Sequence, residues 1–352
     1  MKSIVYIKAQ LSKLKQQQVE ILSSKKGGGE GYAIKKSGHA QVAFIGFPSV
    51  GKSSILNLLT DGHTHSKVAD YDFTTIRAIP GMMEIEHAKI QLIDLPGIIL
   101  GAAKGKGRGK EILSAVRNAD LILIIICFKD DGTLNINDLF SIRKELYDVG
   151  IRLNQTPPKM EIKTLEKGGI GVSSNVKQSF LDDEMIKTIL YEYKIRNAAV
   201  FLYEDLTPDR FIDGLMGNRR YIKELVVINK IDLASESELN KLQELFKDTQ
   251  YIGISAKHEI NIKELKHKIF EQLELMHVYL KQPGKEPDLN EPMILKKGST
   301  IENLCLKIHK DFVRLFKYAQ IWGKSAKYPG QKFQKLDHIL EDGDIVTIYL
   351  KK

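Results

Sequence analysis

One eight-residue stretch carries the residue types that bind phosphate groups. Residues 46–53 read Gly-Phe-Pro-Ser-Val-Gly-Lys-Ser and fit the pattern GxxxxGK[ST]. Glycines let successive backbone N–H groups turn toward phosphate oxygens, and the N-terminus of a following helix adds partial positive charge. We expect Lys52 to reach the β- and γ-phosphates and the Ser53 hydroxyl to bind Mg²⁺. The phosphate-binding residues predicted in this loop are Gly46, Pro48, Ser49, Val50, Gly51, Lys52, Ser53 and Ser54.

Two other segments carry groups that act beside such a loop. Asp94-Leu95-Pro96-Gly97 follows an apolar run, so we expect Asp94 to hold Mg²⁺, mostly through water, and the Gly97 N–H to meet the γ-phosphate. In the polar stretch 70–75, Thr75 can bind Mg²⁺ and sense the γ-phosphate; the alternative is a polar loop without that role. The predicted metal ligands are therefore Ser53, Thr75 and Asp94, and the predicted catalytic residues are Lys52, Thr75 and Gly97.

Two further segments predict recognition of guanine. Asn229-Lys230-Ile231-Asp232 is the only NKxD in the sequence. The Asp232 carboxylate can accept from guanine N1–H and the 2-amino group together, whereas adenine would leave it unpaired. We expect Asn229 to brace the loops and read the base, and the Lys230 stem to cover the ring. In Ser255-Ala256-Lys257, a backbone N–H can contact guanine O6.

Each of these segments lies beside an element that can position it. Apolar runs typical of buried strands precede the phosphate loop, Asp94, Asn229 and Ser255, and a helix-compatible run follows the loop. Strand, glycine loop and helix start are the three parts that the motif requires. The pattern predicts an α/β fold, with a P-loop GTPase domain of mostly parallel sheet flanked by helices. The predicted strands are 42–45, 82–86, 89–93, 121–127, 225–228 and 251–254, and the predicted helices are 53–59, 111–118, 139–147 and 262–279.

The interval between two of these strands is too long for one crossover. Almost a hundred residues separate strand 121–127 from strand 225–228, and a βαβ unit needs only about 30 or more. The surplus contains strand-like runs and a helix, 182–193, so we expect a small inserted α+β domain at 150–222. The nucleotide domain then comprises 38–149 and 223–283.

The two ends of the chain predict separate units. Residues 1–37 combine an amphipathic helix, which packs on a partner or on the body of the protein, with a glycine-rich linker. Residues 281–287 have a linker composition, and 288–352 have the order β, α, β, β of a ubiquitin-like β-grasp domain, whose helix begins at a capping box, Ser299 to Glu302. The apolar stripe of the N-terminal helix comprises Ile4, Ile7, Leu11, Leu14 and Ile21.

Composition narrows the class of protein and partner. The 352 residues carry a net charge of +9 and two cysteines, which fits a reducing compartment. No apolar run reaches the ~18 residues of a membrane span, and the N-terminus is too polar for a signal peptide. We expect a soluble cytoplasmic protein without a membrane partner. The charge favours a polyanion such as RNA, with a solvated lysine-rich surface as the alternative, and nothing indicates specificity for DNA.

Lysines and aromatic residues are interleaved in the C-terminal unit. They occur at Phe316-Lys317-Tyr318, Trp322-Gly323-Lys324 and Lys327-Tyr328. Such a surface can contact RNA, and the alternative is a small core with solvated lysines.

The motifs GFPSVGKSS, YDFTTI, DLPG, NKID and SAK, in this order and spacing, resemble those of Obg-type GTPases. The inserted domain and the tail around FKYAQIWGKSAKYPGQ are similar to the developmentally regulated GTP-binding (DRG) branch, and that tail is similar to a TGS domain. The resemblance covers roughly Gly27 to the C-terminus. It implies a translation-associated switch that hydrolyses GTP to GDP on or near the ribosome and that can bind an accessory regulatory protein.

Two departures from that family pattern and one feature of the expected mechanism affect the expectations. The N-terminal helical segment is shorter than is usual, and Ser49 stands where many relatives have an Asn associated with K⁺. A serine oxygen can still bind K⁺, so K⁺ stays a candidate cofactor beside Mg²⁺ and GTP or GDP. Ile98 follows Gly97, where a glutamine would orient the attacking water, so we expect slow intrinsic turnover.

Two alternative functions remain at this point. One is an RNA- or ribosome-binding module in which the nucleotide is mainly structural. The other is an ATPase on the same scaffold, which would contradict the role expected of Asp232.

Overall fold

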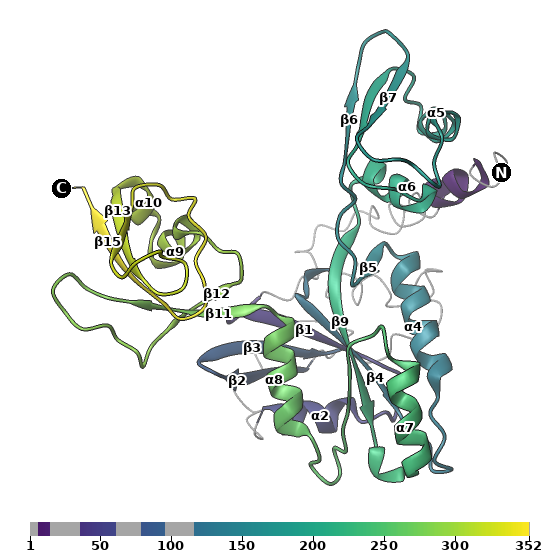
Figure 1. The fold of residues 1–352 in the computed structure, drawn as a ribbon. Helices are drawn as coiled ribbons and strands as arrows, with labels where there is room; N and C mark the ends of the chain where they lie inside the picture. The colour runs from purple at the N-terminus through teal and green to yellow at the C-terminus, as the bar shows by residue number, and fades with distance from the viewer. Residues whose placement is uncertain (1–5, 15–35, 61–78, 96–115, 352) are drawn as a thin grey trace, which may run out of the picture.

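The computed structural model describes residues 6–14, 36–60, 79–95 and 116–351. Thr75, Gly97 and Ile98 lie outside these ranges. The described chain forms a central α/β domain, an inserted unit above it in Figure 1, and a C-terminal unit at one side.

The central sheet is mostly parallel, as the sequence predicts. Its strand order is β10-β9-β4-β1-β3-β2, with β5 paired to β9. Every neighbouring pair is parallel except β2 and β3, which form an antiparallel hairpin. The strands are β1 (Ala40–Ile45), β2 (Ile79–Ile85), β3 (Ala88–Asp94), β4 (Leu121–Cys127), β5 (Ile151–Leu153), β9 (Arg220–Asn229) and β10 (Tyr251–Gly253).

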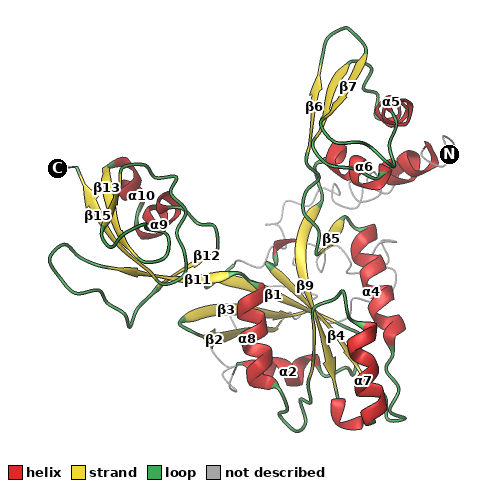
Figure 2. Ribbon diagram, in the orientation of Figure 1, coloured by secondary structure: helices red, strands yellow, loops and turns green. Residues whose placement is uncertain are grey.

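Helices cover both faces of this sheet (Figure 2). The apolar stripes of α2 (Lys52–Leu59) and α8 (Ile262–Gln272) pack on one face, together with alternate residues of β1 and β4. The other face packs against α4 (Ile136–Asp148) and α7 (Glu236–Leu245). The interior strands are buried on both sides, which explains their continuous apolar runs in the sequence.

The inserted unit is a small α+β structure built on its own core. Its sheet has the order β6-β8-β7 and carries two helices on one side (Figure 1). Ala9, in the helix at residues 6–14, is buried in the same core. The elements are β6 (Met160–Thr164), β7 (Ile170–Ser174), α5 (Asp183–Glu192), β8 (Ala198–Leu202) and α6 (Pro208–Met216).

The N-terminal helix packs differently from the expectation drawn from its apolar stripe. Ile7, Leu11 and Leu14 are 60%, 51% and 61% exposed, so this stripe does not pack on the body of the protein. The small side chain of Ala9 makes the buried contact instead. Ile4 and Ile21 lie outside the described residues.

The C-terminal unit is a five-stranded β-grasp sheet with the order β12-β11-β15-β13-β14. Its first strand is β11, which lies in a segment that the sequence analysis assigned to a helix extending to Tyr279. That helix, α8, ends at Gln272, and Glu274 at φ 51° turns the chain into β11. The elements are β11 (Leu275–Leu280), β12 (Met293–Lys296), α9 (Ile301–Ile308), α10 (Lys310–Arg314), β13 (Phe316–Trp322), β14 (Gln331–Phe333) and β15 (Asp344–Leu350).

Two local predictions for this unit need correction. The capping box of α9 is formed by Thr300 and Asn303, whose side chains each bond the backbone of the other, and not by Ser299 and Glu302. Phe316 is 7% exposed and faces the core, so it does not belong to the predicted RNA-contacting surface.

The described part of the chain contains no helix that has both the length and the apolar character needed to cross a lipid bilayer.

Candidate nucleotide site

The loop between β1 and α2 has the tight geometry that its glycines require. Gly51 has φ 93°, and a Cβ atom there would lie 2.3 Å from the Asn229 amide nitrogen. A Cβ atom on Gly46 would lie 2.5 Å from the carbonyl oxygen of Ile125 in β4. Both positions therefore exclude larger residues for steric reasons. Ser49 also has a positive φ, 65°, which completes the curl of the loop.

The side chain of Lys52 lies within this loop. Its ammonium group donates to the carbonyl oxygens of Gly46 and Phe47 at 2.9 and 3.0 Å. Burial lowers the pKa of Lys52, and the nearby Asp94 carboxylate acts in the opposite direction. An ammonium group has three donors, so these two contacts leave one for a phosphate oxygen.

Ser53 and Asp94 meet beside the loop. The Ser53 hydroxyl donates to Asp94 Oδ2 at 3.0 Å. Asp94 is 5% exposed, and its Oδ1 is buried with no hydrogen-bond partner among the described residues. A buried, unpaired carboxylate oxygen next to a hydroxyl is a donor set that suits Mg²⁺, which binds one or two protein oxygens and keeps several waters. The residues present therefore fit this metal.

Asn229, at the end of β9, connects the glycine loop at 46–53 to the segment Ser255-Ala256-Lys257. It is 3% exposed; its amide donates to the Val50 carbonyl at 2.8 Å, and its Oδ1 accepts from the Ala256 N–H at 3.0 Å. The structure thus places Asn229 between the two loops that the sequence analysis expected it to brace. Gly51 leaves the space that the amide occupies.

Asp232 and Ser255 lie together on the base side. Asp232 is in a short 3-10 helix, Ile231–Leu233, directly after Lys230, whose φ is 59°. A hydrogen bond from Ser255, which is fully buried, lowers the pKa of Asp232 despite some opposing effect of burial. The carboxylate is therefore ionised at neutral pH, the form that can accept two hydrogen bonds from a base.

His258 also lies at this edge of the site and was not predicted from the sequence. Its Nε2 is 3.7 Å from Asp232 Oδ2, and its side chain is about half exposed. The only sequence signal was its position directly after Ser255-Ala256-Lys257. Thr75 and Gly97 are not placed here because they lie outside the described residues.

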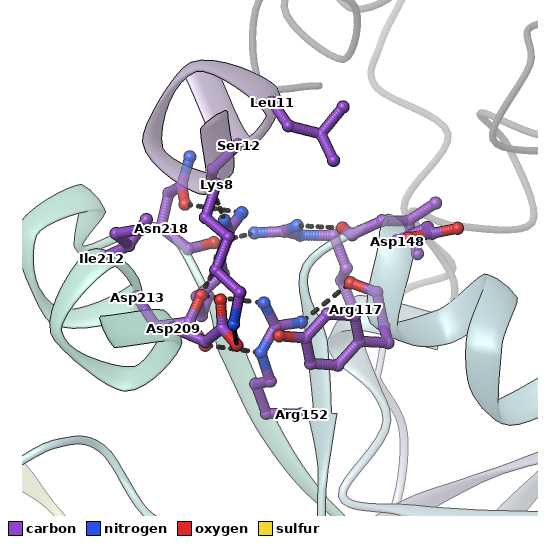
Figure 3. A pocket seen from close by; sticks show the side chains of 13 residues that line it. Lys8, Leu11, Ser12, Arg117, Asp148, Arg152, Asp209, Ile212, Asp213 and Asn218 are labelled. Atoms are coloured by element: carbon purple, nitrogen blue, oxygen red, sulfur yellow. Dashed lines mark hydrogen bonds and ion pairs between the residues drawn. The ribbon is translucent and has the colours of Figure 1, made fainter. Parts of the chain in front are cut away.

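A separate cavity of about 140 Å³ lies at the junction of the helix at residues 6–14, α6 and α4 (Figure 3). Asp213 accepts two bonds from Arg152, at 2.5 and 2.8 Å, and one from Arg219 at 2.7 Å. Lys8 pairs with Asp209 at 2.7 Å. All five charged groups are thus paired, Arg152 and Arg219 with Asp213 and Lys8 with Asp209. This junction holds the inserted unit to the central domain and does not resemble a catalytic site.

A glycine loop that leads into a helix, an adjacent Ser–Asp pair and an asparagine clamp at the carboxyl ends of parallel strands define the class of P-loop GTPases. Family models match successive parts of the chain: a 50S ribosome-binding GTPase at 41–163, the C-terminal region of that domain at 167–275, and a TGS domain at 276–350.

Curated relatives match over almost the whole length. An uncharacterized GTP-binding protein of Methanocaldococcus jannaschii is 53% identical, across 100% of this chain and 88% of the relative. Developmentally-regulated GTP-binding protein 1 of Xenopus laevis is 43% identical and protein 2 of Homo sapiens is 42% identical, each across 98% of this chain and 92% of the relative. The chain therefore belongs to the developmentally regulated GTP-binding protein family.

Solved structures resemble the chain more distantly. The YchF GTPase of Schizosaccharomyces pombe is 16% identical, with a TM-score of 0.49 over 90% of this chain and 99% of that one.

Proposed function

We propose that this chain binds GTP with Mg²⁺ and hydrolyses it to GDP and phosphate. The observation that carries the proposal is the Asn229 clamp, since one buried side chain bonds both Val50 and Ala256. A nucleotide with its phosphates on one loop and its base on the other would span this clamp. Family membership supports the same activity.

Phosphoryl transfer needs positioning and charge neutralisation more than covalent chemistry. Lys52 would donate to the β- and γ-phosphates, while the loop N–H groups cradle them. Mg²⁺, held by Ser53 and Asp94, would neutralise charge on the phosphate oxygens. Thr75 and the Gly97 N–H remain our candidates for sensing the γ-phosphate.

We propose slow intrinsic turnover, because Ile98 cannot orient the attacking water. Activators in other GTPases add about 10³- to 10⁵-fold. A comparable factor here would come from K⁺ near Ser49, from a partner such as a ribosome or an accessory protein, or from Lys106 and Arg108 in the glycine-rich basic stretch at residues 101–110. We infer a nucleotide-dependent switch that acts in translation, in the cytoplasm, with RNA or the ribosome as its partner.

The test is single-turnover hydrolysis of labelled GTP, with and without K⁺ and with and without ribosomes. We expect slow hydrolysis that ribosomes or K⁺ accelerate, and Lys52→Ala should lower it at least 100-fold, since it removes the cation nearest the transferred phosphate. Lys163→Ala, at an exposed lysine of β6 in the inserted unit, is the matched control. Unchanged hydrolysis in Lys52→Ala would reject the site, and tight GTP binding without turnover would favour a structural nucleotide.

A further inference from the structure

In the described chain, helices α9 and α10 pack on one face of the C-terminal sheet. The covered face buries Val278, Ala319, Ile321 and Val346 against α9. Residues that alternate with these point to the opposite face, where the side chains are only partly buried except for Thr347, which is 1% exposed. This second face carries an unusual set of residues.

Strand pairing arranges these outward residues in three rows. Tyr279, Ile345 and Trp322 are register partners and form the first row. The second row contains Thr347, Gln320 and Lys332, and the third contains Tyr349 and Tyr318. Lys281 extends the second row, because its N–H continues the pairing of β11 with β15. Two rows of aromatic rings therefore flank a row with a lysine at each end; we call this surface the aromatic platform.

The contacts within the platform join rings to cations. Lys281 Nζ lies 4.8 Å from the centroid of the Trp322 ring, and Lys332 Nζ lies 5.3 Å from that of Tyr318. Tyr318 and Tyr349 stack with centroids 4.4 Å apart. None of the outward positions named above is acidic, so a bound polyanion would meet only positive charge there.

The central domain packs against only the first part of the outward face of the C-terminal sheet. Leu275 and Ile294, at the start of β11 and in β12, belong to the core of the central domain, and His277 bonds the Glu86 carbonyl in the β2–β3 turn. From Tyr279 onward the face is free of such packing within the described chain. The aromatic rings of the platform are therefore half-buried, Lys332 is exposed and Thr347 between the rows is buried.

We infer that the aromatic platform binds single-stranded RNA by stacking unpaired bases on its rings. This inference rests on the RNA partner of the proposed function and specifies how that RNA is bound. It does not depend on GTP hydrolysis. A cation over an exposed ring is worth about two- to fivefold in an equilibrium constant, whereas a stacked base is worth about 5- to 150-fold. A base can therefore displace the ammonium group of Lys281 or Lys332 from its ring, and the ammonium group then meets a backbone phosphate.

The spacing of the rings selects against a duplex. Trp322 and Tyr318 are four residues apart on β13, which corresponds to about 13 Å along a strand. Stacked bases in a duplex rise only about 3.4 Å per step and hide their faces. Rings this far apart suit bases that are unstacked from each other, as in loops and single strands.

The single tryptophan of the chain makes the test direct. Titrating the full-length protein with a ten-nucleotide oligouridine RNA should quench Trp322 fluorescence, and anisotropy of the labelled RNA should give the same affinity. A blunt-ended, fully paired RNA duplex with the same number of phosphates should bind at least tenfold more weakly. Lack of quenching by any RNA, as expected if a protein segment occupies this face, would overturn the inference.

Variants separate the platform from general charge attraction. Tyr349→Leu should weaken binding about 5- to 150-fold, while Tyr191→Leu, at an exposed tyrosine of α5 in the inserted unit, should not. Lys332→Gln should reduce the slope of log binding constant against log salt concentration by about 0.7. Lys285→Gln, at an exposed lysine outside the platform, should leave the slope unchanged. Circular dichroism confirms folding of each variant. Equal effects of platform and control variants would refute the inference, and GTP hydrolysis measured on the same variants tests the proposed function independently.

Discussion

At the scale of single residues, the pocket depends on groups that the sequence identifies and on contacts that it cannot. Lys52, Ser53, Asp94 and Asn229 could be predicted because they stand in recognisable patterns, the first two at the start of α2 and the other two at the ends of β3 and β9. The double contact of Asn229 could not, because it joins segments up to 179 positions apart. The proximity of His258 to Asp232 likewise depends on how two loops fold together.

Asp232→Asn tests the base preference. An amide can donate to the xanthine 2-oxygen but cannot accept from both guanine donors, so GTP affinity should fall at least 100-fold and xanthosine triphosphate affinity should rise. Isothermal titration calorimetry with both nucleotides measures this directly. His258→Asn is a matched control that keeps the carboxylate. A wild-type preference for ATP would contradict our interpretation of Asp232.

Asn229→Ala tests the clamp separately from the base. The change leaves the Val50 carbonyl and the Ala256 N–H without their partner, and burial makes such a loss costly, about 1–3 kcal/mol. We expect affinity for both GTP and GDP to fall about 5- to 150-fold. Equilibrium binding of a fluorescent GDP analogue checks this, and unchanged affinity would mean that the clamp does not position the two loops.

At the scale of elements, most strands and helices were predictable from apolar periodicity, and β11 shows where that method fails. The helical spacing of Ile262, Leu265 and Ile269 continues at Leu273 and Met276. This spacing therefore predicts a helix longer than α8. The break occurs at Glu274, which adopts a left-handed conformation where glycine would be the usual signal. Tertiary pairing of β11 with β12 and β15 decides its structure.

The junction between the inserted unit and α4 gives a prediction about stability. Asp213 and Arg152 are 5% and 4% exposed in their side chains, so Asp213→Asn leaves a buried guanidinium uncompensated. We expect a loss of about 3–5 kcal/mol. Asp209→Asn, which breaks the half-exposed pair with Lys8, should cost only about 0–1 kcal/mol. Urea unfolding compares the two, and equal losses would contradict the structural role of Asp213.

At the scale of the whole molecule, ion pairs join the C-terminal unit to the central domain. Asp120 pairs with Lys36 and, at 2.7 Å, with Lys296 of β12. Burial alone would raise the pKa of Asp120, but hydrogen bonds from Lys296, Lys36 and the Gln41 N–H lower it overall. The sequence could not predict these pairs, since Lys296 is 176 positions away.

This pKa shift predicts a dependence of stability on pH. Because the folded-state pKa is lowered, the stabilisation is complete above the unfolded-state value of about 3.9 and is lost as pH falls through the folded-state pKa. Asp120→Asn should therefore lower the unfolding free energy by about 1–2 kcal/mol at pH 7 and have less effect below about pH 4. Thermal unfolding of both proteins across pH 3–7 measures the difference. A difference that does not change with pH would contradict the assignment.

Strand β9 has a mechanical consequence. It begins at Arg220 beside the inserted unit, ends at Asn229 in the nucleotide pocket, and is paired with β5, β4 and β10 along its course. The strand is about 33 Å long. Tilting the inserted unit would therefore require β9 to bend or to break its pairing with the neighbouring strands. A displacement of the inserted unit is thus transmitted along β9 to the loop proposed to bind the base, and a nucleotide bound at that loop would restrict movement of the inserted unit in return.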